Sequence, residues 1–212
     1  MDISVPVAAK QRRIETAGRR LGFTASCDPR VAALCGTLAA SVGSGHLLEL
    51  GTGTGLSTLM IAEGMVGGAW LDTVDVDRKL SDTAQRNIGF EKPITFIVED
   101  AGDYLKKCLA RQYAMIFADA WPGKFSHLGL ALDALARGGI YIIDDLLPQD
   151  NWPVGHQKHV DTLLALFAEL DGFTMTRLDW ATGVAVIVKT GTNPVPRSYY
   201  RHSEFGFLFS EA

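Results

Sequence analysis

The sequence lacks several features that would assign it to a class at once. No apolar run approaches the roughly 20 residues of a membrane-spanning helix, and residues 1–25 carry five basic side chains without the apolar core of a signal peptide. Its three cysteines are scattered and form no CxxC pair, which argues against a disulfide framework or a zinc site and favours buried, inert thiols. A net charge of −4 gives no general attraction to nucleic acid or anionic lipid. We therefore expect a cytoplasmic protein that binds a small molecule, and neither nucleic acid nor membrane.

The composition is that of a folded α/β protein. The chain has 212 residues, of which 47% are hydrophobic and 21% charged. This length allows one domain with a full core and is too short for two ordinary domains. We predict a single domain over residues 1–212, with N-terminal helices in 1–45, a core in 46–190 and a C-terminal tail in 191–212. The aromatic-rich tail is expected to lie over the domain surface, or to form an apolar contact in a homodimer.

Short apolar runs alternate with segments of helical periodicity from residue 46 onward. Five of them are near-continuous, which is typical of parallel strands covered on both faces: 46–50, 71–76, 94–100, 113–119 and 139–145. The helix before the fifth is expected to include Leu135 and to stop at Gly138 and Gly139. Two further runs, 173–180 and 183–190, are joined by two residues and must be antiparallel. The sequence predicts a Rossmann-like, doubly wound sheet of about seven strands, mostly parallel, with a C-terminal antiparallel hairpin.

The segment LLELGTGTGLSTL (47–59) places three glycines between the first strand and a helix. Glycine permits a tight turn and a close approach of a ligand to the backbone, and the free N–H groups of the next helix attract an anion. The spacing is GxGxG, whereas dinucleotide folds use GxGxxG, and Leu56 is the next residue. Glycines alone would also suit a simple strand-to-helix connection.

Acidic residues follow the next three strands. Asp75 lies about 20 residues beyond the last glycine, where an acid typically accepts hydrogen bonds from a ribose diol, and Asp77 is its fallback. Glu99 and Asp100 end the third strand, and Asp119 ends the fourth. Such a crevice suits a ligand with an ammonium or sulfonium charge better than a pyrophosphate, which disfavours NAD.

These motifs resemble, in order and spacing, those of the class I S-adenosylmethionine-dependent methyltransferases. The segments that carry the resemblance include TVDVD, VEDA, IFADAWPGKFSHL and GGIYIIDDLL. Within that class they are similar to the small O-methyltransferases of the catechol and caffeoyl-CoA type, over roughly residues 30–190. The resemblance implies S-adenosylmethionine as cofactor, and it assigns the cofactor-binding residues Glu49, Gly51, Thr52, Gly53, Gly55, Ser57, Asp75, Val76, Asp100, Ala101, Asp119 and Trp121. In this assignment Ser57 binds the methionine carboxylate, Asp119 lies by the amino group and Trp121 packs beside the adenine.

The resemblance also implies a metal site. Metal-dependent members hold a divalent cation with an Asp after the fourth strand and an Asp-Asn pair after the fifth, and the corresponding residues here are Asp119, Asp144 and Asp145. The third is Asp where the family usually has Asn. Oxygen ligands of this kind suit Mg²⁺, Ca²⁺ or Mn²⁺. The alternative is that Asp144 caps the strand end and Asp145 faces solvent.

Lys124 and Asp145 are the candidate catalytic residues. Family members commonly carry a lysine three residues after the fourth-strand Asp, but Pro122 stands there and Lys124 follows two positions later. Lys124 is therefore either a displaced general base or a surface lysine. In the loop after the fifth strand, Trp152 and His156 are candidates for the acceptor pocket. For His156 and His159 a solvated helix start is favoured over a metal pair.

The leading hypothesis is a methyltransferase that acts on a small-molecule hydroxyl, with a divalent cation as a candidate helper. Three alternatives stay open: a metal-independent methyltransferase acting on another acceptor, a non-catalytic cofactor-binding module and an NAD oxidoreductase. The sequence does not name the acceptor, because acceptor pockets are built by variable loops.

Overall fold

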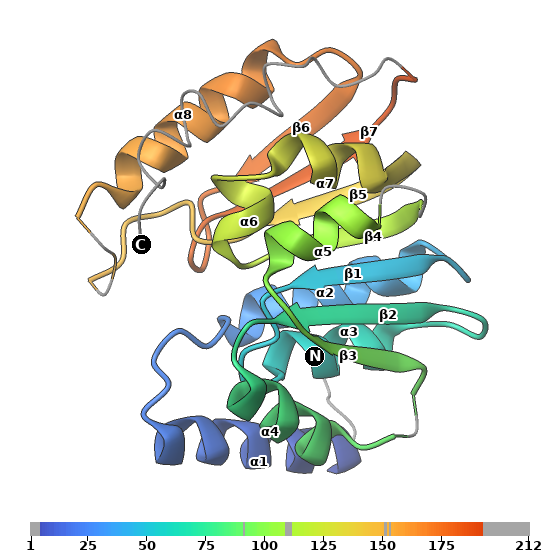
Figure 1. Ribbon diagram of the computed structural model, residues 1–212, viewed down its shortest axis with the longest axis vertical. Coiled ribbons are helices and arrows are strands. Elements are labelled where there is room, and N and C mark those ends of the chain that lie inside the picture. The colour runs from blue at the N-terminus through green and yellow to red at the C-terminus, as the bar shows by residue number, and fades with distance from the viewer. Residues whose placement is uncertain (1–4, 91, 109–111, 151, 153, 193–212) are drawn as a thin grey trace.

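A computed structural model describes residues 5–90, 92–108, 112–150, 152 and 154–192. Its central feature is a seven-stranded sheet with the order β3-β2-β1-β4-β5-β7-β6 (Figure 1). The strands are β1 (His46–Leu50), β2 (Trp70–Asp75), β3 (Ile94–Val98), β4 (Tyr113–Ala118), β5 (Leu135–Ile143), β6 (Phe173–Leu178) and β7 (Val184–Lys189). The first five strands are parallel to their neighbours among these five, whereas β7 runs antiparallel to both β5 and β6. The predicted sheet, including its C-terminal hairpin, is confirmed.

Helices cover both faces of this sheet (Figure 1). They are α1 (Val5–Leu21), α2 (Pro29–Ser41), α3 (Leu56–Gly64), α4 (Arg78–Ile88), α5 (Ala101–Lys107), α6 (Trp121–Lys124), α7 (Leu128–Ala134) and α8 (His156–Glu169). Successive strand residues point to opposite faces: Leu47 belongs to the core beneath α2 and α3, and Leu48 to the core beneath α5, α7 and α8. Because helices bury both faces of the sheet, the sequences of its strands are continuous apolar runs.

The boundary between α7 and β5 differs from the prediction. The helix ends at Ala134, and Leu135 already pairs with Tyr113 of β4, four residues before the predicted strand start. The register then shifts before Met115 pairs with Ile140, so Gly138 and Gly139 lie inside an irregular part of the strand rather than at a helix end. The ammonium of Lys189, on β7, donates hydrogen bonds to the carbonyls of Leu132 and Leu135 and satisfies the helix terminus.

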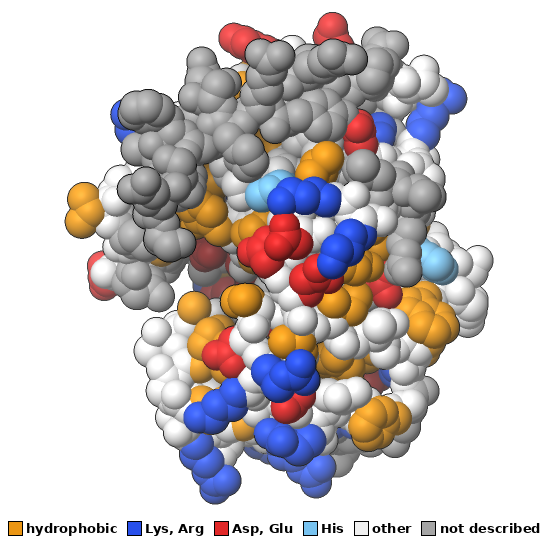
Figure 2. Space-filling view, viewed as in Figure 1, with side chains coloured by type: hydrophobic (Ala, Val, Ile, Leu, Met, Phe, Trp, Pro, Cys, Tyr) orange, Lys and Arg blue, Asp and Glu red, His pale blue; other side chains and the backbone are white. Residues whose placement is uncertain are grey.

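The N-terminal helices pack against α3 on one face of the sheet. Helix α2 begins directly after Asp28, whose side chain accepts a hydrogen bond from the Arg30 backbone N–H, with Pro29 in the first turn. It packs closely on α3, while α1 lies over α3 and α4. Lys and Arg side chains gather over α1 and α4 (Figure 2), where Arg12, Arg13, Arg20 and Arg86 line one groove.

Three further expectations concern membrane-spanning helices, the C-terminal tail and the cysteines. Within the residues that the structure describes, no helix has both the length and the apolar character needed to cross a membrane. The tail predicted to cover the surface or to form a dimer contact lies outside the described residues from position 193 onward. The three cysteines are free thiols: Cys35 and Cys108 are buried, and Cys27 is only partly buried.

Candidate functional site

The glycine loop follows β1 where the strand order reverses, between β2 and β4. Gly51 has φ of 101°, and a Cβ there would lie 2.7 Å from the carbonyl oxygen of Asp119. Gly55 has φ of 95° at the N-cap of α3, and its Cβ would lie 2.7 Å from that of Ala84 on α4. Both positions therefore require glycine, because each combines a left-handed backbone with close packing. The loop is held tightly against β4 and α4.

Glu49 lies behind this loop and not on the surface of a cavity. It is fully buried, and its Oε2 atom accepts hydrogen bonds from Thr58 at 2.5 Å and from Thr73 at 2.6 Å. Thr73 also shares a 2.6 Å hydrogen bond with Thr52. The Oε1 atom is buried with no hydrogen-bond partner among the described residues. Desolvation raises the pKa of Glu49 to about 7, despite the hydroxyls of Ser57, Thr58 and Thr73, which favour its charged form.

Asp75 occupies the tip of β2, beside the loop. Its Oδ2 accepts the backbone N–H of Gly53 at 2.7 Å, and its Oδ1 accepts that of Asp77 at 2.8 Å. These bonds fix the carboxylate while leaving lone pairs on both oxygens for a ligand. Asp77 accepts the N–H groups of Lys79 and Leu80 as the N-cap of α4, and Asp100 similarly caps α5 through Asp103.

A cavity of about 340 Å³ opens between the glycine loop and the tips of β2, β3 and β4. Of the predicted cofactor residues, it is lined by Gly51, Thr52, Gly53, Ser57, Asp75, Val76, Asp100, Ala101 and Asp119. Glu49 and Gly55 support the loop from behind, as described above. The structure thus brings most of the predicted set to one cavity, whose walls combine loop backbone, carboxylates and a helix N-terminus.

A second cavity of about 370 Å³ adjoins the first. The two share lining residues Ala25, Ser26, Cys27, Asp119 and Ala120. Trp121, expected beside the adenine, lines only the second cavity, because the turn after β4 directs it toward α8. The role of Trp121 beside the adenine stays a prediction.

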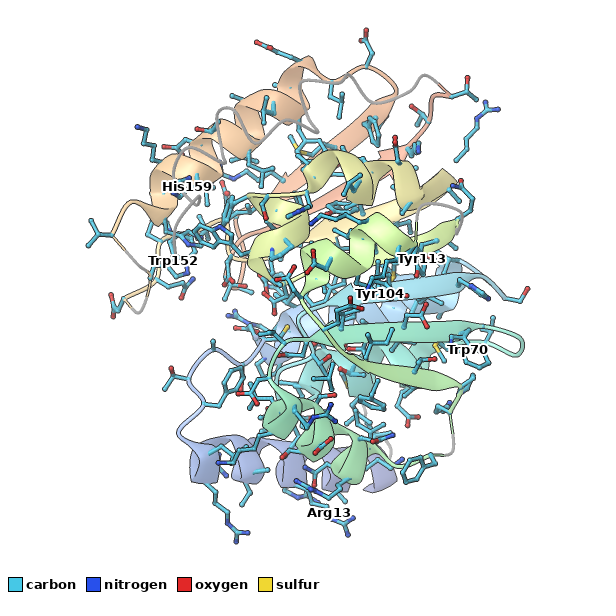
Figure 3. The ribbon with its side chains drawn as sticks, viewed as in Figure 1. Arg13, Trp70, Tyr104, Tyr113, Trp152 and His159 are labelled. Atoms are coloured by element: carbon cyan, nitrogen blue, oxygen red, sulfur yellow. The ribbon has the colours of Figure 1, made fainter. Side chains whose placement is uncertain are left out.

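Aromatic rings form one wall of the second cavity. Trp152 stacks on His156 with ring centroids 3.7 Å apart, and Phe125 meets His156 edge-on at 5.1 Å. Trp152 projects from the loop before α8, on which His159 also lies (Figure 3). His156 is 6% exposed and its Nε2 lies 3.4 Å from the carbonyl oxygen of Asp145, so the expected solvated helix start is wrong for this residue. Desolvation lowers the pKa of His156, which keeps the ring neutral near pH 7.

Asp119, Asp144 and Asp145 lie together at the floor of the second cavity and are called the acidic cluster below. Asp144 is 1% exposed, and its Oδ1 accepts hydrogen bonds from the Asp145 N–H and the Thr182 hydroxyl. Asp145 has φ of 63°, a left-handed conformation that Asp tolerates better than most residues. The cluster is therefore built from a buried strand end and one strained residue after it.

Lys124 lies within the acidic cluster, and the surface-lysine interpretation is wrong. The residue is 3% exposed, and its Nζ lies 3.4 Å from Asp145 Oδ2 and 3.7 Å from Asp119 Oδ1. It also donates a hydrogen bond to the backbone carbonyl of Asp144 at 3.2 Å. Burial opposes its charge, but Asp145, Asp119 and Asp144 outweigh that effect and raise the pKa of Lys124.

The pKa values of two carboxylates are raised as well, which disfavours their charged forms. Burial raises the pKa of Asp119 well above its usual range, against the attraction of Lys124. Burial and the charge of Asp145 raise the pKa of Asp144 to about 6. One lysine therefore does not fully compensate the negative charge that the cluster buries.

The predicted metal ligands lie close together, and one carboxylate oxygen of each already has a partner within the protein. Asp119 and Asp145 each direct a carboxylate oxygen to Lys124, and Oδ1 of Asp144 already accepts two hydrogen bonds. A different set, Cys27 with Asp119 and Asp144, has its ligand atoms within 4.8 Å of one another. Burial raises the pKa of the Cys27 thiol, which opposes the thiolate form that binds metals.

The segment between α1 and α2 is the part of the site that sequence reasoning missed. Phe23 packs over the glycine loop, since a Cβ on Gly53 would lie 3.1 Å from its ring. Phe23 and residues 25–27 contribute to the first cavity, and residues 24–28 to the second. This short, aperiodic segment carries no motif, so only the fold shows that it covers both cavities.

The fold and the paired cavities define an α/β protein with the architecture of a class I methyltransferase. Residues 48–146 match a family model described as a methyltransferase domain. No curated protein sequence gives a significant match. The fold that the predicted resemblance implies is confirmed, and the solved structures with this fold described below include O-methyltransferases.

Three solved structures illustrate the likeness. TomG from Streptomyces achromogenes, an O-methyltransferase involved in tomaymycin synthesis solved with SAM, has a TM-score of 0.76 at 19% identity, over 90% of this chain and 92% of its own. An O-methyltransferase from Bacillus cereus in complex with SAH has a TM-score of 0.74 at 19% identity, over 89% of this chain and 94% of its own. The SAH-bound methyltransferase PaMTH1 of Podospora anserina has a TM-score of 0.71 at 19% identity, over 89% of each chain. At this identity, the likeness establishes the fold.

Proposed function

We propose that the chain transfers the methyl group of S-adenosylmethionine to a hydroxyl of a small molecule. The observation that carries this proposal is the pair of adjoining cavities, which share Cys27, Asp119 and Ala120 as a common wall. The first has the groups to hold an amino acid and a nucleoside, and the second has room for a separate acceptor. Two reactants held side by side meet the main requirement of methyl transfer, which is an in-line approach.

The first cavity suits the cofactor group by group. Asp75 keeps lone pairs on both oxygens for ribose hydroxyls, while Asp100 and Ala101 border the space for the base. Ser57 and the N-terminus of α3 face the cavity where a carboxylate would be stabilised. Asp119, on the shared wall, supplies negative charge for the ammonium and sulfonium groups.

The second cavity suits a flat acceptor with a hydroxyl group. Trp152, His156 and Phe125 offer aromatic faces and edges, while Lys124 and Asp145 supply charge at the floor. In the proposed reaction the acceptor oxygen attacks the methyl carbon, the carbon–sulfur bond breaks and S-adenosylhomocysteine is released. Lys124 donates a hydrogen bond to the acceptor oxygen, and the hydroxyl proton passes to the carboxylate of Asp145.

Calorimetry with S-adenosylmethionine tests the cofactor site. The wild type is expected to bind, and Asp75→Ala to weaken binding by about 10- to 100-fold, because a charged acceptor of hydrogen bonds is lost. Asp77→Asn is the matched control, since Asn keeps the helix cap and removes the neighbouring charge. Absence of binding by the folded wild type would refute the proposal, and a larger loss in Asp77→Asn would transfer the ribose role to Asp77.

Transfer of labelled methyl groups to a panel of phenols and aliphatic alcohols tests the reaction. Methylated product that carries the label on oxygen supports the proposal. Product with the label on nitrogen or carbon supports the alternative acceptor. Tight cofactor binding with no turnover over the whole panel favours a non-catalytic cofactor-binding module.

A further inference from the structure

Lys124 stands where the resemblance would place a metal ion. Its ammonium contacts a carboxylate oxygen of Asp145 at 3.4 Å and one of Asp119 at 3.7 Å, and it donates to the backbone of Asp144 at 3.2 Å. Each of the three residues predicted as metal ligands thus contributes an oxygen to the lysine. The lysine side chain is 4% exposed, whereas those of its partners Asp119 and Asp145 are 13% and 31% exposed.

The local fold explains how Lys124 reaches this position from five residues after Asp119. Helix α6 is a kinked turn in which Pro122 and Gly123 have non-helical backbone angles. The turn is fixed by a 2.6 Å hydrogen bond from the Tyr141 hydroxyl to the Gly123 carbonyl and by another from the Gly123 N–H to the Ser126 carbonyl. A Cβ at Gly123 would lie 2.6 Å from Leu50, so the turn is closely packed. These hydrogen bonds and this packing therefore fix the turn that directs Lys124 toward the acidic cluster.

The ammonium and a divalent cation would compete for the same oxygens. A divalent ion needs carboxylate oxygens at about 2.0–2.6 Å, and those of Asp119 and Asp145 that face Lys124 would have to turn toward it. The ion and the ammonium would then be like charges side by side in a site that is only partly exposed to water. Asp145 itself stands where metal-dependent members usually carry Asn, and its additional charge is the one that Lys124 pairs.

We propose that Lys124 is the resident cation of the acidic cluster and takes the place of a divalent metal there. The inference deepens the proposed function and rests on it for the role toward the acceptor: the lysine, rather than a metal ion, holds the acceptor oxygen. The exclusion of the metal ion by the ammonium of Lys124 depends on neither cofactor nor acceptor, so it can be tested on the protein alone.

Binding of Mn²⁺, followed by electron paramagnetic resonance on the full chain without cofactor, tests this inference. The wild type is expected to show no saturable binding, and Mn²⁺ or EDTA to leave its thermal midpoint unchanged. Lys124→Met removes the ammonium and is expected to gain one site with affinity at least about tenfold above the wild type, with a midpoint that rises on adding Mn²⁺. Lys189→Met is the matched control, because Lys189 is a partly buried lysine whose ammonium donates to the backbone carbonyls of Leu132 and Leu135.

A second variant keeps the test decisive if Lys124→Met does not fold. Lys124→Met combined with Asp145→Asn removes one positive and one negative charge, so the net charge of the cluster is preserved, and it is also expected to gain Mn²⁺ binding. Saturable Mn²⁺ binding by the wild type that Asp119→Asn abolishes would overturn the inference, as would no gain in either folded variant. Since the measurement needs no turnover, failure of methyl transfer and failure of this inference are distinguishable.

Discussion

At the scale of single residues, Glu49 joins the stability of the fold to the cofactor loop. Its carboxylate binds the hydroxyls of Thr58 on α3 and Thr73 on β2, and through Thr73 it reaches Thr52 in the loop. Complete burial raises its pKa to about 7 from a usual value of 4.5. The folded state therefore binds a proton here at pH values where the unfolded chain has lost it.

The raised pKa of Glu49 makes the free energy of unfolding depend on pH. The contribution of Glu49 to stability is fully present below pH 4.5, and it is lost as the pH rises toward and through 7, because the folded state holds more protons in that window. The loss amounts to about 3 kcal/mol at pH 8. Glu49→Gln keeps an acceptor for the threonine hydroxyls and removes the titration, so its free energy of unfolding is expected to fall less steeply than that of the wild type.

Urea unfolding at intervals from pH 5 to pH 8 measures this difference. At each pH, the difference between the free energies of unfolding of the wild type and the variant gives the contribution of Glu49. The contributions of Asp119 and Asp144, whose pKa values are also raised, cancel in this difference. Glu169→Gln, at the exposed end of α8, controls for the loss of one carboxylate. Parallel curves for the wild type and Glu49→Gln would contradict the prediction.

The residues of the site could be predicted from the sequence only in part. Asp75, Asp100 and Asp119 follow strands whose ends are visible as apolar runs, and parallel strand ends meet at one edge of the sheet. Trp121 and Lys124 were less predictable because both belong to the irregular turn of α6, whose path depends on contacts with Tyr141 and Leu50 far along the chain. Position relative to a strand is local information, whereas the direction of a turn is not.

At the scale of elements, α2 and α3 approach so closely that their contact requires glycine. A Cβ on Gly64 would lie 1.9 Å from the carbonyl oxygen of Gly36 and 2.7 Å from its carbonyl carbon, both of them backbone atoms. Gly64→Ala would therefore force the two helices apart, and we expect it to lower the free energy of unfolding by about 2–3 kcal/mol. Because α3 carries Gly55 and Ser57 at its start, the same change is expected to weaken cofactor binding.

Gly67→Ala is the matched control, since a Cβ there meets no atom within 4 Å. Thermal unfolding should show a midpoint lower by about 2–4 °C for each kcal/mol in Gly64→Ala, and little change or a slight rise in Gly67→Ala. Equal midpoints for the two variants would mean that the helices separate at no cost.

The order and type of elements were accessible from sequence because their signals are strong and local. Near-continuous apolar runs indicated the buried parallel strands, and the two residues between β6 and β7 required an antiparallel pair. The end of α7 was predicted wrongly, because Leu135 continues the helical pattern and its pairing with Tyr113 is a tertiary contact. On α2 the fully buried residues include Ala32 and Gly36, since close helix packing favours small side chains, while the larger Leu34 and Leu38 are partly buried against the core.

At the scale of the whole molecule, the segment of residues 23–28 joins the N-terminal helices to the strand tips. It covers both cavities, with Phe23 over Gly53 and Cys27 in the common wall, whereas the strand tips form the opposite side. A cofactor in the first cavity would therefore contact both of these parts of the chain. Binding should stabilise the folded protein by about 2.7 kcal/mol when the ligand is present at 100 times its dissociation constant.

Hydrogen exchange with and without S-adenosylhomocysteine measures where that stabilisation arises. Backbone amides of residues 23–28 and of the glycine loop are expected to gain protection together, because the ligand holds one against the other. The β6–β7 hairpin, at the far edge of the sheet, is the internal control and should change only as far as global unfolding contributes to its exchange. Protection confined to the loop, with residues 23–28 unchanged, would mean that the N-terminal segment is not part of the cofactor site and that the cavity closes by other means.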